Sequence, residues 1–555
     1  MSERISREAK LAEADAGGRA LTLWRHLAFA AVIAALFAGG LQLRNWTWKR
    51  TEPVRFEWDI RNGYHWGERT LQQGEKVTGR NLATAGEWES WRILFAGYVT
   101  LYDAVEKETA NRDYGLDYPP LRLLIMSAWA KKVWMHHAGA EIARPEQKGR
   151  ALLRFNLVFE ALSAVAMFFL VRFWVERDEA GIVPSFARAF APEWHGRMRG
   201  LLAAAFVWLN PSVILTSHGW PQWDVWIIPF YLFAALAASA GRWFWCGALL
   251  AIGAMLKGQI LIVAPFFLLW PLFQKEWRSA AHLLLGFAAA LALLLSPWLL
   301  NGTNDRLTFI AVVSLGTLLL RRLAPAPRWR FVVALASFSA FAIGAVSGGS
   351  FGWLRLGFIY GADLPQGLFG GTGVTAGACY NLPSLLAGAG FSLKSELFRL
   401  QIGNAAVVFT LQWGLRILYV AALAACALWA GRRARVKDAR TLLALAAPWL
   451  LMLALLAQMR ERYSIWMAAI TAVALALSVR LSILHLIFSL LSTAMIAHVM
   501  LAEKGFDPAP QLLRFLDPQN GIGAWIFLIC AALYFAAAGG IPEFARRRIP
   551  RFLRA

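Results

Sequence analysis

Apolar runs of about 18 to 25 residues recur along the whole of this 555-residue chain. As a helix, each run is long enough to cross a hydrocarbon core of about 30 Å. Hydrophobic residues make up 58% of the chain. The mild alternation and even turn spacing of an outer-membrane barrel are absent from the sequence. The pattern therefore predicts an all-α polytopic membrane protein.

The formal net charge of +22 comes from Lys and Arg that stand between the apolar runs. A basic chain can bind nucleic acid, but this placement is typical of the positive-inside rule, with anionic lipid headgroups as the partner. We therefore expect a lipid bilayer and no nucleic acid. The four cysteines show no metal-ligand spacing, so neither a zinc site nor a disulfide framework is expected.

Charge bias predicts about fourteen transmembrane helices, with both termini in the cytoplasm. Residues 1–25 form a basic tail before an uncleaved first span, 26–540 the membrane domain, and 541–555 a second basic tail. Long external loops are expected at 44–149 and at 348–403. The expected spans are 26–43, 151–171, 200–216, 222–240, 243–257, 259–273, 280–299, 307–320, 331–347, 404–430, 441–457, 463–479, 482–502 and 522–540.

The first external loop is too long for a simple connector and is expected to carry two interfacial helices. One begins at Asp59 and places Tyr64, Gly67 and Leu71 on one face. The other begins at Pro119-Pro120 and covers 121–136. If 121–136 crossed the membrane, the five arginines of 172–199 would fall outside, so we interpret it as interfacial.

Asp59 is the first candidate for chemistry because it lies just beyond the first span. It is either a helix N-cap or a general base at the place where a membrane-embedded substrate meets water. On the same predicted face lie cations that could hold a phosphate: Lys257, His218, Arg460 and Arg462. An isolated Lys usually snorkels, and His218 could be a structural histidine.

Three external segments carry a resemblance to a known enzyme class. They are Gly115-Leu116-Asp117-Tyr118-Pro119-Pro120-Leu121, Ser217-His218-Gly219-Trp220-Pro221-Gln222-Trp223-Asp224 and Gln458-Met459-Arg460-Glu461-Arg462-Tyr463. With an acidic residue early in the first loop, their order resembles the GT-C class of integral-membrane glycosyltransferases. The first segment is similar to that of the dolichyl-phosphate-glucose-dependent glucosyltransferases of the N-glycan pathway. Trp220-Pro221 and Arg460 replace residues usual in that group, which leaves the sugar open.

The resemblance implies a GT-C-like fold and transfer of a hexose, with inversion, from a polyprenyl-phosphate donor to a glycan or lipid-linked acceptor. The expected location is the periplasmic face of a bacterial-type inner membrane. Asp59 is the expected catalytic base. Groups expected to bind the donor phosphate are Arg460, Arg462, Lys257 and His218. Other substrate contacts are expected from Tyr64, Asp117, Tyr118, Gln222, Asp224, Glu461 and Asn381.

No cofactor is required by this chemistry, although Asp117 or Asp113 could hold a divalent metal. Two other functions stay open. A flippase or transporter for lipid-linked sugars would need charges along a pathway within the spans. An O-antigen ligase or polymerase would share the many spans and a large external loop.

Overall fold

Helices dominate the computed structural model, which describes residues 2–540 with several gaps. The residues outside the description within that range are 56, 109–115, 117, 137–144, 182–191, 301–303, 325, 348–378, 403–404, 458, 507–509 and 520. Asp113, Asp117, most of the predicted 348–403 loop and the C-terminal basic tail thus lie outside the described residues.

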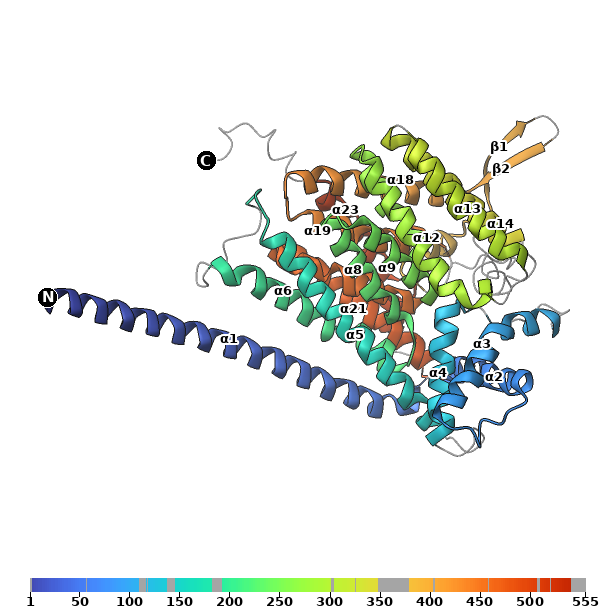
Figure 1. The fold of residues 1–555 in the computed structure, drawn as a ribbon, viewed down its shortest axis with the longest axis horizontal. Coiled ribbons are helices and arrows are strands. Elements are labelled where there is room, and N and C mark those ends of the chain that lie inside the picture. The colour runs from blue at the N-terminus through green and yellow to red at the C-terminus, as the bar shows by residue number, and fades with distance from the viewer. Residues whose placement is uncertain are drawn as a thin grey trace.

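The elements in the first half of the described chain are all helical (Figure 1). These are α1 (Ser2–Arg50), η1 (Glu52–Val54), α2 (Glu57–Thr78), α3 (Glu87–Glu108), α4 (Pro120–His136), α5 (Pro145–Val175), α6 (Pro192–Trp208), α7 (Pro211–Ile214), η3 (Leu215–Gly219), η4 (Asp224–Ile227), α8 (Ile228–Ser239), α9 (Trp243–Leu256), α10 (Ile260–Val263) and α11 (Pro265–Phe273).

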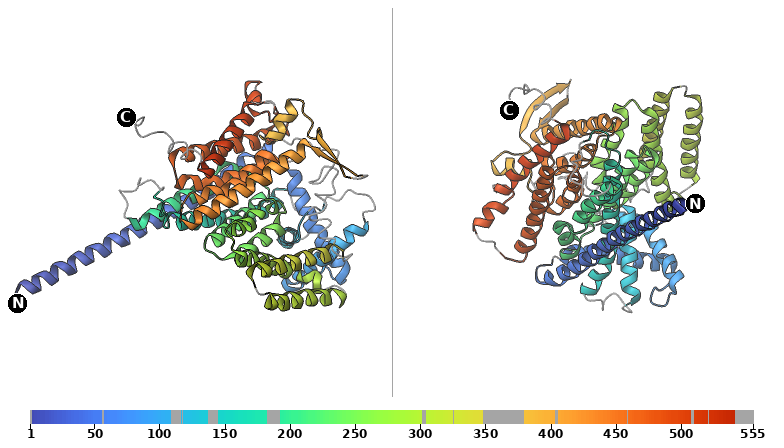
Figure 2. Two further views of the ribbon diagram at one scale, coloured as in Figure 1. Left: turned by 90° about the horizontal axis from the view of Figure 1, so that it is seen from above. Right: turned by 90° about the vertical axis from the view of Figure 1, so that its left-hand side faces the viewer.

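The second half adds one β-hairpin to a further set of helices. The elements are α12 (Trp277–Leu300), α13 (Asn304–Leu323), α14 (Pro327–Ser347), α17 (Leu382–Gly388), β1 (Glu396–Ile402), β2 (Ala405–Thr410), α18 (Leu411–Arg435), α19 (Thr441–Leu455), η6 (Glu461–Tyr463), α20 (Ser464–Ile470), η7 (Thr471–Ala476), α21 (Val479–Ala502), α22 (Pro510–Leu516) and α23 (Ile522–Gly539). The hairpin protrudes from the helices, and α13 and α14 lie at their edge (Figure 2).

Seven helical segments of the described residues are long and apolar enough to cross a membrane. They are Leu23–Arg50, Lys148–Val175, Trp194–Gly219, Trp277–Trp298, Leu411–Arg435, Val479–Ala502 and Ile522–Gly539. Four shorter apolar segments lie between them, at Asp224–Ser239, Trp243–Leu256, Ile260–Phe273 and Thr441–Leu455. The chain is thus a largely helical membrane protein.

Several predicted spans are interrupted rather than continuous. The expected 200–216 span ends as an α-helix at Trp208 and continues through α7 and the π-turn η3. The expected 463–479 span divides into α20 and the 3-10 segment η7. Proline at 211 favours such a break because its ring clashes with the preceding turn. These interruptions bring non-helical backbone into the buried part of the molecule.

The start of the predicted 404–430 span is wrong. Residues 405–410 form strand β2, which pairs antiparallel with β1, and α18 begins only at Leu411. Val407, Val408 and Phe409 explain the difference, because β-branched and aromatic residues fit a pleated strand as well as an apolar helix. The sequence dipeptide Gly403-Asn404 between the two strands is typical of a hairpin.

Between α1 and α5, the described part of the predicted first external loop holds three α-helices, one more than expected. α2 and α4 begin close to the expected positions, and α3 is the additional helix. Glycine permits their close packing: a Cβ at position 97 would lie 1.8 Å from the carbonyl oxygen of Thr70, and one at 67 would lie 2.3 Å from that of Met126. As predicted, Tyr64 and Leu71 are buried on one face of α2.

The α2–α4 group lies at one end of the bundle (Figure 1). α5 starts beside it, where the Trp129 indole of α4 donates to the Lys148 carbonyl at 2.7 Å, and spans roughly 45 Å. At its other end Glu179 forms an ion pair with Lys437. The residues that directly follow α5 and α18 therefore meet at the end of the bundle opposite α4.

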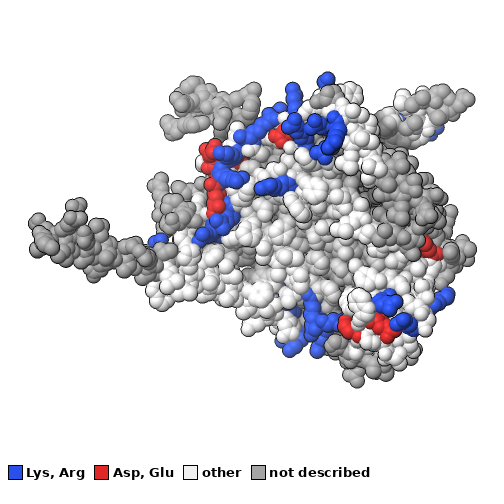
Figure 3. Space-filling model, viewed as in Figure 1, with Lys and Arg blue, Asp and Glu red and all other residues white. Residues whose placement is uncertain are grey.

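Charged side chains gather in two bands on the surface shown in Figure 3, with a wide uncharged stretch between them. The last turn of α18 contributes Arg432, Arg433 and Arg435 to the same end as Lys437. Exposed Leu, Val and Ile side chains of α18 and α21, such as Val420 and Leu490, lie between the ends of these helices. This distribution fits a bilayer around the middle of the bundle.

Candidate functional site

The Asp59 carboxylate lies in the first turn of α2 and is held by donors from two distant segments. Oδ2 accepts from the Gln222 side-chain amide at 2.5 Å and from the Trp220 indole at 3.2 Å. A guanidinium nitrogen of Arg462 lies 3.6 Å from the same oxygen. Among the described residues, none donates to Oδ1. These contacts of the carboxylate thus all hold one oxygen, Oδ2.

A second carboxylate lies behind the first. Asp224, the first residue of η4, is fully buried and forms a direct ion pair with Lys257 at the end of α9. Arg462 Nε lies 3.5 Å from Asp224 Oδ2, so Arg462 stands between the two carboxylates. We call Asp59, Asp224, Lys257 and Arg462 the Asp59 cluster. It combines two acids with two cations and is formally neutral.

Two stacked aromatic rings form one wall of the Asp59 cluster. Tyr463 and Trp466 are parallel within 9°, with centroids 4.8 Å apart. The Lys257 ammonium lies 4.5 Å and 5.2 Å from the two ring centroids. The Trp466 indole also donates to the Asp224 carbonyl at 2.7 Å. Cation–π contact and the Asp224 ion pair together fix Lys257 in place.

The turn that presents Trp220 and Gln222 is fixed from behind by Asn156 of α5. Its side-chain amide donates to the carbonyls of Ser217 and Gln222 at 2.8 and 2.9 Å. Its oxygen accepts from the Trp226 indole at 2.7 Å. Because Asn156 is fully buried, these bonds compete with no water and hold the turn against α5.

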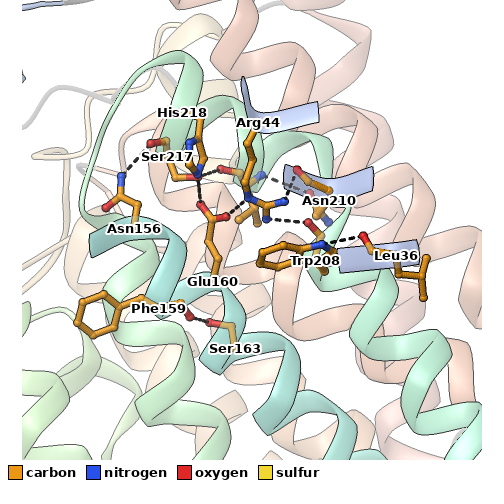
Figure 4. Close-up of polar contacts among 12 residues, drawn as sticks. Leu36, Arg44, Asn156, Phe159, Glu160, Ser163, Trp208, Asn210, Ser217 and His218 are labelled. Carbon is orange, nitrogen blue, oxygen red and sulfur yellow. Dashed lines mark hydrogen bonds and ion pairs between the residues drawn. The ribbon is translucent and has the colours of Figure 1, made fainter. Parts of the chain in front are cut away.

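One helical turn further along α5, Glu160 belongs to a buried charged group whose other members come from α1 and η3 (Figure 4). It pairs with Arg44 of α1, accepts from the Ser217 hydroxyl, and lies 3.2 Å from His218 Nε2. Arg44 also donates to the Trp208 carbonyl at 2.8 Å and covers the Trp208 ring. We call Arg44, Glu160, Ser217 and His218 the Glu160 cluster.

The predicted phosphate ligands separate into different environments. Arg462 lies in the Asp59 cluster and its side chain is 24% exposed. Lys257 is also there, but it is engaged with the buried Asp224. His218 contacts Glu160, in the Glu160 cluster. Arg460 is exposed and, within the described residues, makes no ion pair.

Two of the predicted substrate contacts belong to the fold. Tyr64 is buried against Trp129 and Lys148, and this burial raises the pKa of its hydroxyl. Asn381 caps α17, where its oxygen accepts from the Ser384 amide at 2.8 Å and its amide donates to the Leu456 carbonyl at 3.3 Å. For Asn381 these contacts are those of a helix N-cap.

The other predicted contacts that the structure describes bond to α2 or lie close to the Asp59 cluster. Tyr118 accepts a hydrogen bond from Asn62 of α2 at 3.3 Å and packs edge-on against Trp223. Glu461 is buried, and this burial raises its pKa against the opposing effect of Arg462 and Arg460. Gln222 and Asp224 belong directly to the site, whereas the position of Asp117 lies outside the described residues.

Several site residues were missed by the sequence interpretation. Asn156 was not singled out, although an Asn four residues before Glu160 in an apolar span is a detectable signal, since i and i+4 side chains share a face. Tyr463 and Trp466 have no such signal, because aromatic residues are common throughout this chain. Among the described residues, no group of three or more His, Cys, Asp or Glu is arranged to hold a metal ion.

The chain matches no protein-family model and shows no significant similarity to a curated protein.

Proposed function

We propose that this protein is a GT-C-type glycosyltransferase that uses a polyprenyl-phosphate-linked hexose. The observation that carries the proposal is the convergence of Asp59, Gln222, Asp224 and Arg462 from three separate segments. Two of these segments, 217–224 and 458–463, are among those that resemble the enzyme class in sequence, and Asp59 is the acidic residue early in the first loop; the segments are up to about 400 residues apart. A carboxylate beside a cation at the end of an apolar bundle is what a lipid-phosphate sugar donor requires.

In this mechanism, the acceptor hydroxyl loses its proton to Asp59 Oδ1 as its oxygen bonds to the anomeric carbon. The bond from that carbon to the phosphate oxygen breaks, and the lipid phosphate leaves with the electron pair. Oδ2 stays bound to Gln222 and Trp220, which orients the base. Arg462, with Arg460 beside it, supplies the positive charge for the departing phosphate. The configuration of the sugar is inverted in one displacement.

The proposed topology keeps about fourteen spans: the seven long helices, the four shorter apolar segments, α13, α14 and the interrupted segment α20–η7. The α2–α4 group would lie on the periplasmic face of the inner membrane. The basic loops after α5 and α18 would lie in the cytoplasm. The contact between Glu179 and Lys437 supports placing both loops on one side.

The experiment is a transfer assay with membranes that contain the overproduced protein. Radiolabelled polyprenyl-phosphate glucose, mannose and arabinose are offered with glycolipid acceptors from the cell envelope. We expect label in the acceptor with one of these donors. Asp59→Asn should lower turnover by a factor on the order of 10² or more, because the amide keeps the size but cannot take the proton.

Glu52→Gln is the matched control, because Glu52 is an exposed carboxylate seven residues earlier in the chain. It should transfer sugar at the normal rate. Normal transfer by well-folded Asp59→Asn would rule out Asp59 as the base. Absence of transfer with every donor, at verified expression, would reject the proposed function.

A transporter of lipid-linked sugars is the second candidate, and the Glu160 cluster is the observation that favours it. Glu160, Arg44 and His218 are ionisable groups within candidate spans, a position that often marks a transport pathway. Translocation of a labelled polyprenyl-phosphate sugar in vesicles, without its consumption, would support this function instead of transfer.

A further inference from the structure

Of the two cations in the Asp59 cluster, only Lys257 touches a carboxylate directly. Arg462 lies 3.6 Å from Asp59 and 3.5 Å from Asp224. Both distances exceed the about 2.7–2.9 Å of a charge-assisted hydrogen bond. Arg462 is also the more accessible cation, with 24% of its side chain exposed against 6% for Lys257. Arg462 therefore lies between the two carboxylates without a short hydrogen bond to either of them.

The neutrality of the Asp59 cluster limits how an anion can bind. An incoming phosphate must compete with a carboxylate for one of the two cations. If the phosphate bound Lys257, the fully buried Asp224 would lose its direct partner, and an unpaired buried charge is costly. Taking Arg462 leaves Asp224 with Lys257, and it leaves Asp59 with Gln222 and Trp220. Arg462 is therefore the cation that an anion removes at the lower cost.

We propose that Arg462 is shared between Asp59 and the phosphate of an anionic lipid, so that lipid binding releases Asp59 from its ion pair. The identity of the lipid rests on the proposed function, but the competition requires only a phosphate group on an apolar tail. The exchange orders the reaction, since the base loses its ion-pair partner only when a donor is present. The neutral donors Gln222 and Trp220 keep the carboxylate in position throughout.

Competition of this kind has a reciprocal consequence. If the phosphate weakens the hold of Arg462 on Asp59, then the Asp59 charge weakens the binding of the phosphate by the same factor. Neutralising Asp59 should therefore tighten phosphate binding. This outcome is opposite to that expected for a residue that merely binds the substrate, whose replacement weakens affinity.

The test measures the Kd of a polyprenyl monophosphate for the purified full-length chain in detergent micelles. We expect Asp59→Asn to tighten binding about fivefold or more and Arg462→Gln to weaken it about tenfold or more. The double variant should bind like Arg462→Gln, because Asp59 acts through Arg462. The uncharged polyprenol is the ligand control, and its affinity should not respond to Asp59→Asn.

Lys76→Gln is the matched protein control, since it removes an exposed cation in the last turn of α2, the helix that carries Asp59. It should leave the Asp59→Asn effect intact. Phosphatidylglycerol and inorganic phosphate serve as further probes that identify the source of the phosphate. A tightening for polyprenyl phosphate alone assigns the site to the donor, and a tightening for all three extends the sharing to phosphate in general.

An unchanged or weaker affinity of well-folded Asp59→Asn for all three anions would overturn the inference. This variant decides the question even if Arg462→Gln does not fold. Because the measurement involves no sugar transfer, its outcome does not depend on whether the protein is a glycosyltransferase. If Asp59→Asn binds the phosphate more tightly but the native protein transfers no sugar, the glycosyltransferase is rejected and the sharing of Arg462 is retained. If the native protein transfers sugar but Asp59→Asn does not bind more tightly, the sharing is rejected and the glycosyltransferase is retained.

Discussion

The buried ion pair between Arg44 and Glu160 should be among the most sensitive points of the fold. Only 3% of Arg44 and 1% of Glu160 are exposed, so water does not screen their interaction. Two unit charges 4 Å apart attract by about 4 kcal/mol at an effective dielectric constant of 20. Removing one partner of such a pair typically costs about 3–5 kcal/mol, because the other charge stays buried.

The surroundings predict unequal costs for the two single substitutions. In Arg44→Met, Glu160 keeps His218 at 3.2 Å and the Ser217 hydroxyl. In Glu160→Met, the partners left to Arg44 among the described residues are the Trp208 ring and the carbonyls of Gly40 and Trp208. We therefore expect Glu160→Met to lower the free energy of unfolding more, by about 5 kcal/mol, and Arg44→Met to lower it by about 3 kcal/mol.

The double variant Arg44→Met/Glu160→Met should be less destabilised than the sum of the single variants by about 2 kcal/mol or more, since no unpaired charge remains. The assay is reversible unfolding in mixed SDS micelles, followed by helical ellipticity. Ser163→Ala is the control, because Ser163 donates only to the Phe159 carbonyl of its own helix. Additive single variants, within about 0.5 kcal/mol, would refute the argument that these charges depend on each other.

Three further predictions concern packing, topology and pH. Gly97→Ala should destabilise the folded protein by about 1–3 kcal/mol through contact with the Thr70 carbonyl, whereas Gly39→Ala, with open space at its Cβ, should not. Because the four native cysteines are buried, an impermeant thiol reagent on intact spheroplasts should label Arg80→Cys and spare Lys437→Cys; the reverse pattern would invert the proposed orientation. Burial raises the pKa of Glu461 above its ordinary 4.5, so the folded state holds a proton there that the unfolded state loses. Its contribution to stability therefore falls as pH rises through that window, and the thermal stability of Glu461→Gln relative to the native protein should increase from pH 5 to pH 8.

The helical membrane fold and the main elements of the site could be predicted from the sequence. Apolar length specifies spans because the bilayer has a fixed thickness. The basic loops predict which helix ends share a side, so Asp59, Gln222 and Arg462 are expected to lie near one another. The structure brings these three residues into contact, and their proximity follows from the helix end that each occupies.

Side-chain partners could not be predicted in this way. Lys257 and Asp224 are both polar residues at helix ends, and nothing in their spacing indicates that they pair with each other. The sequence does not predict helix α3, because its Gly74–Gly97 packing depends on contacts between helices. Strand β2 cannot be distinguished from a helix in the sequence, because a short apolar run suits either structure.

The interrupted helices around the Asp59 cluster explain why buried asparagines, as well as charged residues, lie close to it. Backbone groups freed at a break cannot reach water inside the bundle, so each must find a partner in the protein. Asn156 serves the carbonyls of Ser217 and Gln222. An asparagine side chain has two N–H donors and one acceptor oxygen, so it can bond both the free carbonyl groups and the free N–H groups at a helix break.

Two more buried asparagines act in the same manner. Asn210 accepts from the Ser212 amide at 3.1 Å and donates to the Ala468 carbonyl at 3.3 Å, which joins the break before α7 to α20. Asn381 joins α17 to the end of α19 at Leu456. Aspartate at these positions would lose the donors and add a buried charge. The polar turns that carry Gln222 and Arg462 can therefore enter an apolar bundle only because neutral amides satisfy the backbone behind them.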